Sequence, residues 1–214
     1  LESGSVYSSK VPVGHGIQLL TLIITVLLAA AGIWWPMRRR TQRFRPGVGP
    51  FFALLGVAFL AAEVGFIQRL TFLLGHPTYA LTVVLSGLLI ASGIGAAASR
   101  RLATPAQGRS LLLLAAVTLS LAAAASALVI PRAIALGFNA RLAIAIALVA
   151  TAGLSMGIPF PWAIGRLRHL GEHELVPWAF AVNAFFTVVA AAAAPLLAVQ
   201  TGFSALLLLA ALLY

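Results

Sequence analysis

Five long stretches of the chain contain no Asp, Glu, Lys or Arg, and this feature limits the possible folds more than any other. They cover residues 11–37, 70–99, 110–131, 142–165 and 175–214. Each is longer than the roughly 18 apolar residues that indicate a membrane-spanning helix. Strands of a membrane barrel would instead alternate apolar and polar residues in segments of about ten positions. The sequence therefore predicts an all-α, polytopic transmembrane helix bundle.

Composition agrees with a membrane protein and excludes several other classes. Only 8% of the residues are charged, whereas soluble domains carry roughly 25%. A net charge of +10 would indicate nucleic-acid binding in a soluble protein. Here the basic residues lie at the ends of apolar stretches, so they indicate membrane topology, and no nucleic-acid partner is expected. The chain has no Cys, which excludes disulfides, thiol catalysis and Cys-based metal sites.

Seven helical segments are predicted along the chain. Their approximate ranges are 17–35, 51–74, 78–98, 110–130, 142–158, 177–199 and 202 onward. Pro131 is expected to end the fourth, and Pro159 and Pro161 the fifth, because proline breaks the helical hydrogen-bond pattern. Residues 1–16 are expected to be an extracytoplasmic segment, and one interpretation makes them the tail of a missing domain. Residues 17–214 are expected to be the transmembrane domain, truncated at the C-terminus.

The distribution of arginine predicts the orientation of the segments. Residues 36–50, 99–109 and 160–176 hold ten arginines, whereas the opposite loops hold only Lys10, Arg132 and Arg141. Because cytoplasmic loops carry an excess of Lys and Arg, the three Arg-rich loops are predicted to be cytoplasmic. The N-terminus then lies outside the cell. The predicted location is the bacterial cytoplasmic membrane, with the lipid bilayer as the first partner.

Small residues recur every four positions in two of the segments, which predicts close helix packing. In the third segment they are Gly87, Ala91 and Gly95, and the fifth has the pattern Ala145, Val149, Gly153, Gly157.

Glu63 is the most informative polar residue, because it lies near the middle of the second segment. An ionised carboxylate there costs roughly 2.5–3.5 kcal/mol on insertion scales, so it must be protonated, paired or in contact with water. One interpretation is a proton- or cation-handling site, and the other is a hydrogen bond or ion pair between helices. Candidate partners on other segments are Asn183, Thr187 and Ser155.

Four further residues complete a candidate intramembrane polar site with Glu63: Gln68, Arg69, His76 and Asn183. Arg69 is rotated about 120° from Glu63 around the helix, so it is expected to extend outward or to pair with another helix. His76 precedes Pro77 in an outer turn, where a turn-forming role is expected. His169 and His173 have the spacing of a zinc-binding pair but lack a third ligand. No catalytic residue, metal or cofactor is therefore predicted.

Three motifs, in order, resemble the membrane domain of bacterial spermidine-synthase-like proteins. The first is EVGFIQRLTFLLGHPTYALTVVLSGLLIASGIGAAASRR at Glu63–Arg101, the second is GIPFP at Gly157–Pro161, and the third is PWAFAVNAFFTVV at Pro177–Val189. Phe180, Ala184, Thr187 and Ala96 depart from that pattern, where the family has Trp, Gly, Ser and Ser. The family's soluble aminopropyltransferase domain has no counterpart in this chain. The resemblance implies a membrane module rather than a catalyst.

Three functions are compatible with these observations. The first is a non-catalytic membrane module that acts as an anchor or scaffold, with other membrane subunits or a fused soluble domain as partners. The second is a transporter or channel-like domain for a polyamine, cation or proton that uses Glu63. The third is the membrane part of an aminopropyltransferase whose catalytic domain is absent. A scaffold predicts polar residues held in pairs, whereas a transporter predicts a water-filled path to Glu63.

Overall fold

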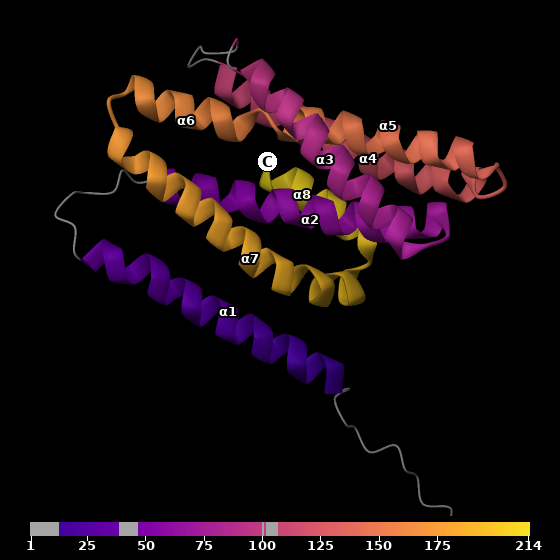
Figure 1. The fold of residues 1–214 in the computed structure, drawn as a ribbon, viewed down its shortest axis with the longest axis horizontal. Coiled ribbons are helices and arrows are strands. Elements are labelled where there is room, and N and C mark those ends of the chain that lie inside the picture. The colour runs from indigo at the N-terminus through magenta and orange to yellow at the C-terminus, as the bar shows by residue number, and fades with distance from the viewer. Residues whose placement is uncertain (1–12, 39–46, 100, 102–106) are drawn as a thin grey trace, which may run out of the picture.

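A computed structural model describes residues 13–38, 47–99, 101 and 107–214. These residues form an all-α bundle without strands, which confirms the predicted fold class (Figure 1). The elements are α1 (Val13–Arg38), α2 (Val48–Leu74), α3 (Pro77–Ser99), α4 (Gly108–Ala133), α5 (Phe138–Met156), α6 (Pro159–His169), a 3₁₀ turn (His173–Leu175), α7 (Val176–Thr201) and α8 (Phe203–Leu213). Each of the seven predicted segments coincides with one of these helices. The expected N-terminal segment, residues 1–16, lies largely outside the described residues.

Five stretches are long and apolar enough to cross a membrane, so the chain is a multi-pass membrane protein. They are Val48–Leu74, Pro77–Ser99, Gly108–Ala133, Phe138–His169 and His173–Ala198. Shorter apolar helices cover Leu19–Leu28 and Phe203–Leu213. Large side chains on the outer surface remain exposed, for example Leu89 at 75% and Leu212 at 84%. Such a surface fits contact with lipid rather than with water.

Prolines shape two helices differently from the prediction. Pro131 was expected to end the fourth segment, but α4 continues through it to Ala133. Proline in the last turn removes only one backbone hydrogen bond, which membrane helices tolerate. Pro159 does separate two helices, but it also starts α6 within a stretch that was expected to be a loop. The fixed backbone angle of proline suits the first position of a helix.

The helices pack in layers around α2. Figure 1 shows α1 outermost, followed by α7, then α2 with α8, and finally α3, α4 and α5. Helix α2 contacts every helix from α3 to α8. Its Phe66, Leu70 and Leu73 side chains have no exposed surface and belong to the main core cluster. The position of α2 at the centre explains why it is the best buried of the five candidate spans.

The two small-residue patterns meet each other, which confirms that Gly87, Ala91 and Gly95 face another helix. A Cβ atom added at Gly87 would lie 2.8 Å from Val149, and one at Gly95 would lie 2.1 Å from the Leu154 carbonyl oxygen. A Cβ at Gly153 would lie 2.9 Å from that of Ala91. In these contacts, residues later in α3 meet residues later in α5, so the two helices run in the same direction.

The three Arg-rich loops flank helix ends that lie together. Trp162 of α6 contacts Gly108 at the start of α4, and Phe52 near the start of α2 packs in one cluster with Leu167 of α6. Partly buried Leu175, just before α7, packs against the same cluster. If each predicted segment crosses the membrane once, the three Arg-rich loops fall on the same side, which agrees with this arrangement. Which side of the membrane this end faces stays a prediction.

Candidate functional site

The five predicted polar residues are spread over the bundle and do not form one site. Glu63, Gln68 and Arg69 lie in α2, His76 lies in the turn after it, and Asn183 lies in α7. Arg69, Asn183, Glu63 and His76 have different surroundings, and Gln68 is partly buried in α2.

Arg69 pairs with another helix, which is one of the two arrangements expected from the sequence. Its guanidinium donates a hydrogen bond to the hydroxyl of Ser204 in α8, while its Nε atom is buried and has no hydrogen-bond partner among the described residues. Gly65, one turn earlier on the same face, allows close approach, because a Cβ there would lie 2.9 Å from the Leu207 side chain. The pair therefore sits in a closely packed contact between α2 and α8.

Asn183 does not bind Glu63, and that expectation was wrong. Its side-chain Nδ2 donates to the backbone oxygen of Phe52 at 3.1 Å. Gly56 makes room for this contact, because a Cβ there would lie 2.5 Å from the Asn183 carbonyl oxygen. Glu63 is seven residues further along α2, about 10 Å away along the axis. The axial position of α7 against α2, which sequence does not specify, therefore separates the two side chains.

Glu63 is half-buried and makes no hydrogen bond with any residue that the structure describes. Its neighbour Val64 packs against Ala194 of α7 in a small apolar cluster. An intramembrane carboxylate without a polar partner is a candidate for function, because its burial is otherwise unfavourable.

His76 has the turn-forming role that its position predicted. Its Nδ1 accepts a hydrogen bond from the backbone N–H of Thr78 at 3.2 Å, and its ring lies 5.8 Å from that of Tyr79. Gly75 before it has φ of 78°, a left-handed conformation that glycine adopts readily, and it ends α2. These contacts explain His76 without a ligand.

Two further polar contacts between helices were missed by sequence analysis. Arg141 of α5 donates to the backbone oxygen of Leu73 in α2 at 3.2 Å. The hydroxyls of Thr118 in α4 and Ser155 in α5 hydrogen-bond to each other. A polar residue in an apolar segment is visible in the sequence, but its partner depends on helix packing.

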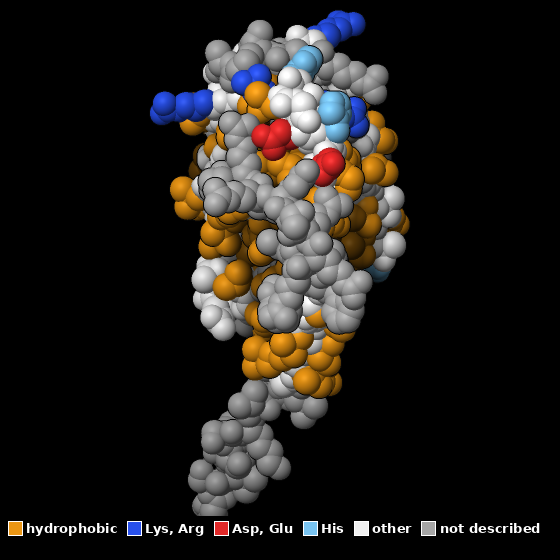
Figure 2. All heavy atoms as spheres, turned by 90° about the vertical axis from the view of Figure 1, so that its left-hand side faces the viewer, with side chains coloured by type: hydrophobic (Ala, Val, Ile, Leu, Met, Phe, Trp, Pro, Cys, Tyr) orange, Lys and Arg blue, Asp and Glu red, His pale blue; other side chains and the backbone are white. Residues whose placement is uncertain are grey.

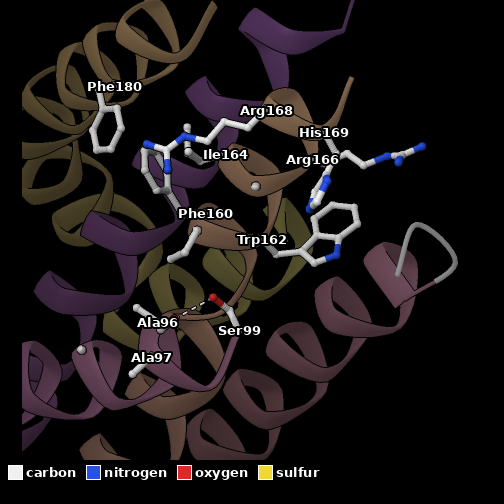
Figure 3. A pocket seen from close by; sticks show the side chains of 13 residues that line it. Ala96, Ala97, Ser99, Phe160, Trp162, Ile164, Arg166, Arg168, His169 and Phe180 are labelled. Atoms are coloured by element: carbon white, nitrogen blue, oxygen red, sulfur yellow. Dashed lines mark hydrogen bonds between the residues drawn. The ribbon is translucent and has the colours of Figure 1, made fainter. Parts of the chain in front are cut away.

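A hollow of about 620 Å³ lies between the end of α3, the helix α6 and the start of α7 (Figure 3). Small residues of α3 form one wall, and aromatic residues of α6 and α7 form the other. The Phe160 and Phe180 rings lie 4.9 Å apart in an edge-to-face arrangement. Figure 3 shows Arg168 extending toward Phe180. Sequence analysis missed this hollow because its walls come from segments far apart in the chain.

A second hollow of about 340 Å³ adjoins the first and reaches further into the bundle. The two share Gly93, Ala96, Phe160 and Pro161. The second is lined mainly by apolar side chains, and its polar lining includes Ser92 and Asn183. Glu63 lines neither hollow. A water-filled path to Glu63 is therefore not part of this space.

The opening of the first hollow is positively charged. Arg166, Arg168 and His169 line it, and none of the three forms an ion pair with a residue in the described part of the chain. Figure 2 shows Arg, His and Glu side chains gathered at this end of the molecule, above a largely hydrophobic surface. The opening therefore favours a ligand or partner with negative charge.

His169 and His173 do not belong to a larger ligand set, because the described residues contain no group of three or more His, Asp or Glu that could hold a metal ion.

Comparisons of the chain with protein-family models, curated proteins and solved structures found no match. The described residues thus form a packed helical frame with a cationic, aromatic-lined hollow.

Proposed function

We propose that this chain is a non-catalytic integral membrane module, an anchor or scaffold for a larger protein or membrane complex in the bacterial cytoplasmic membrane. The observation that carries this proposal is a set of four polar contacts between helices, each with its partner inside the bundle, whereas Glu63 has no partner among the described residues. Such contacts connect α2 with α7, α2 with α8, α2 with α5, and α4 with α5. A frame fixed in this way suits a module that positions other parts rather than one that rearranges.

The resemblance to the membrane part of spermidine-synthase-like proteins suggests what is anchored. A fused soluble domain or a separate subunit would then supply any aminopropyl transfer, because this chain has no Asp and only four Glu. The hollow itself is a poor polyamine site. Polyamines are cations, and Arg166 and Arg168 at its opening would repel them.

Extraction of the full-length protein from its native membrane into nanodiscs tests the proposal. We expect a stable assembly with at least one further polypeptide or fused domain, measured by native mass spectrometry. Proteoliposomes containing the assembly should show no uptake of spermidine, Na⁺ or protons above that of empty vesicles. A protein that purifies alone and drives uptake would contradict the scaffold proposal.

A transporter or channel-like domain is the second candidate, and it is favoured by Glu63 alone. This carboxylate lies within a membrane-spanning helix and has no hydrogen-bond partner among the described residues. If Glu63 handles a proton or cation, Glu63→Gln should leave folding intact and abolish uptake in the same proteoliposomes. Equal uptake by the two proteins would exclude Glu63 from any transport function.

A further inference from the structure

Helical glycines in this bundle mark places where another helix comes close. A Cβ atom added to any of six of them would lie within 3.0 Å of another helix: Gly56, Gly65, Gly87, Gly95, Gly108 and Gly153. Gly16 in α1, Gly93 in α3 and Gly165 in α6 differ, because a Cβ atom at any of the three would meet nothing within 4 Å. Glycine lowers helix stability relative to alanine, and no described contact compensates at these three positions.

Of these three glycines, Gly93 and Gly165 line the same hollow. Gly93 is followed on α3 by Ala96 and Ala97, which also line it, so its wall is made of small side chains. Small residues permit two helix backbones to approach closely. A lipid tail has no backbone and adapts its shape, so it does not require glycine. The composition of the wall therefore favours a helix as the occupant.

The dimensions of the hollow also fit a helix. On α3 the lining of the two connected hollows extends from Leu89 to Ser99, about 15 Å or nearly three helical turns. The space runs from Leu89, about halfway along α3, to the cationic opening at Arg166 and Arg168. An occupant with apolar residues inside and a carboxylate at the opening would match both ends.

We infer that this hollow receives a transmembrane helix of a partner, that is, of polypeptide outside residues 1–214. The partner helix is apolar where it lies against Gly93, Ala97 and Gly165, and it carries a carboxylate that pairs with Arg166 or Arg168. The inference rests on the proposed scaffold function and names the element that the scaffold holds.

Photo-crosslinking in native membranes tests this inference. The photoreactive amino acid benzoylphenylalanine is placed at Ala97, which lines the hollow, and at Ala147 as a control, which lines a separate hollow against α4. We expect position 97 to yield one cross-linked peptide, identified by mass spectrometry as an apolar segment of helix length outside residues 1–214 that carries a carboxylate. Adducts only to phospholipid, or only to peptides within residues 1–214, would overturn the inference.

Two sets of variants show whether that cross-link depends on the hollow. Gly93→Leu and Gly165→Leu should each fold, because space is open there, and each should lower the cross-link yield at position 97 at least tenfold. Ala147→Leu should leave the yield unchanged. Arg166→Gln with Arg168→Gln should lower it several-fold, whereas Arg109→Gln, an exposed arginine outside the hollow, should not.

Undiminished yield in both glycine variants would refute docking in this hollow. A different result would contradict the scaffold proposal, because that proposal depends on whether an assembly survives extraction into nanodiscs. An intact assembly with lipid adducts at position 97 would overturn the helix inference and leave the scaffold proposal standing.

Discussion

At the scale of single residues, buried polar side chains differ in whether their partner is a side chain or the backbone. Asn183 and Arg141 donate to backbone oxygens of α2, whereas Arg69 depends on the hydroxyl of Ser204. Removal of that hydroxyl leaves a partly buried guanidinium with one partner fewer. Removal of a side chain that accepts a hydrogen bond should therefore lower stability strongly only where its charged donor remains in the bundle.

Ser204→Ala should accordingly destabilise the protein by about 1–3 kcal/mol, because the Arg69 guanidinium loses its acceptor. Ser86→Ala is the matched control, since the exposed Ser86 hydroxyl bonds only to the Thr82 carbonyl within its own helix. Reversible unfolding in mixed micelles measures both free energies. Equal values for the two variants would show that the Arg69–Ser204 contact contributes nothing.

Glu63→Leu should raise stability by up to about 3 kcal/mol, because it removes a carboxylate from the membrane interior and leaves no described group unpaired. Glu63→Gln should change stability less, since an amide remains polar. The thermal midpoint in detergent compares the two variants with the parent. A lower midpoint for Glu63→Leu would reveal a polar partner outside the described residues.

At the scale of elements, α3 contains two glycines with opposite surroundings only two residues apart. Gly95 packs against the Leu154 carbonyl oxygen of α5, whereas Gly93 points into open space. The same chemical change should therefore have opposite effects at the two positions. Comparison of substitutions at the two positions separates the requirement for close packing from the general loss of helix stability that glycine causes.

Gly95→Ala should destabilise the bundle by about 1–3 kcal/mol through overpacking. Gly93→Ala should stabilise the purified chain by up to about 1 kcal/mol through helix propensity. Thermal unfolding in one detergent measures both shifts. Shifts of the same sign would contradict the packing of α3 against α5.

At the scale of the whole molecule, the open question is which side of the membrane each end faces. Single cysteines at Arg43, Gln107 and Arg168 should resist an impermeant thiol reagent added from the periplasmic side, because the Arg-rich loops are predicted to be cytoplasmic. The chain has no native Cys, so each introduced thiol is unique. Arg43 lies outside the described residues. Thr78→Cys in the outer turn should react and serves as the positive control.

Labelling of any two of the three cytoplasmic positions from the periplasmic side would overturn this topology. A failure of Thr78→Cys to react would do the same. The described helix ends next to the three loops lie together, so the four results must agree with each other.

The sequence by itself determined seven of the eight described helices, whereas α6 lies where a loop was expected. Apolar segments, with Gly75 and Pro77 between α2 and α3, were sufficient for these seven because a chain in lipid must satisfy its backbone hydrogen bonds within each segment. The small residues of α3 and α5 also predicted close packing. Their mutual contact, the partner of Asn183 and the hollow beside Gly93 depended on tertiary structure. Lipid and protein interior are equally apolar, so hydrophobicity does not specify the axial register or rotation of one helix against another.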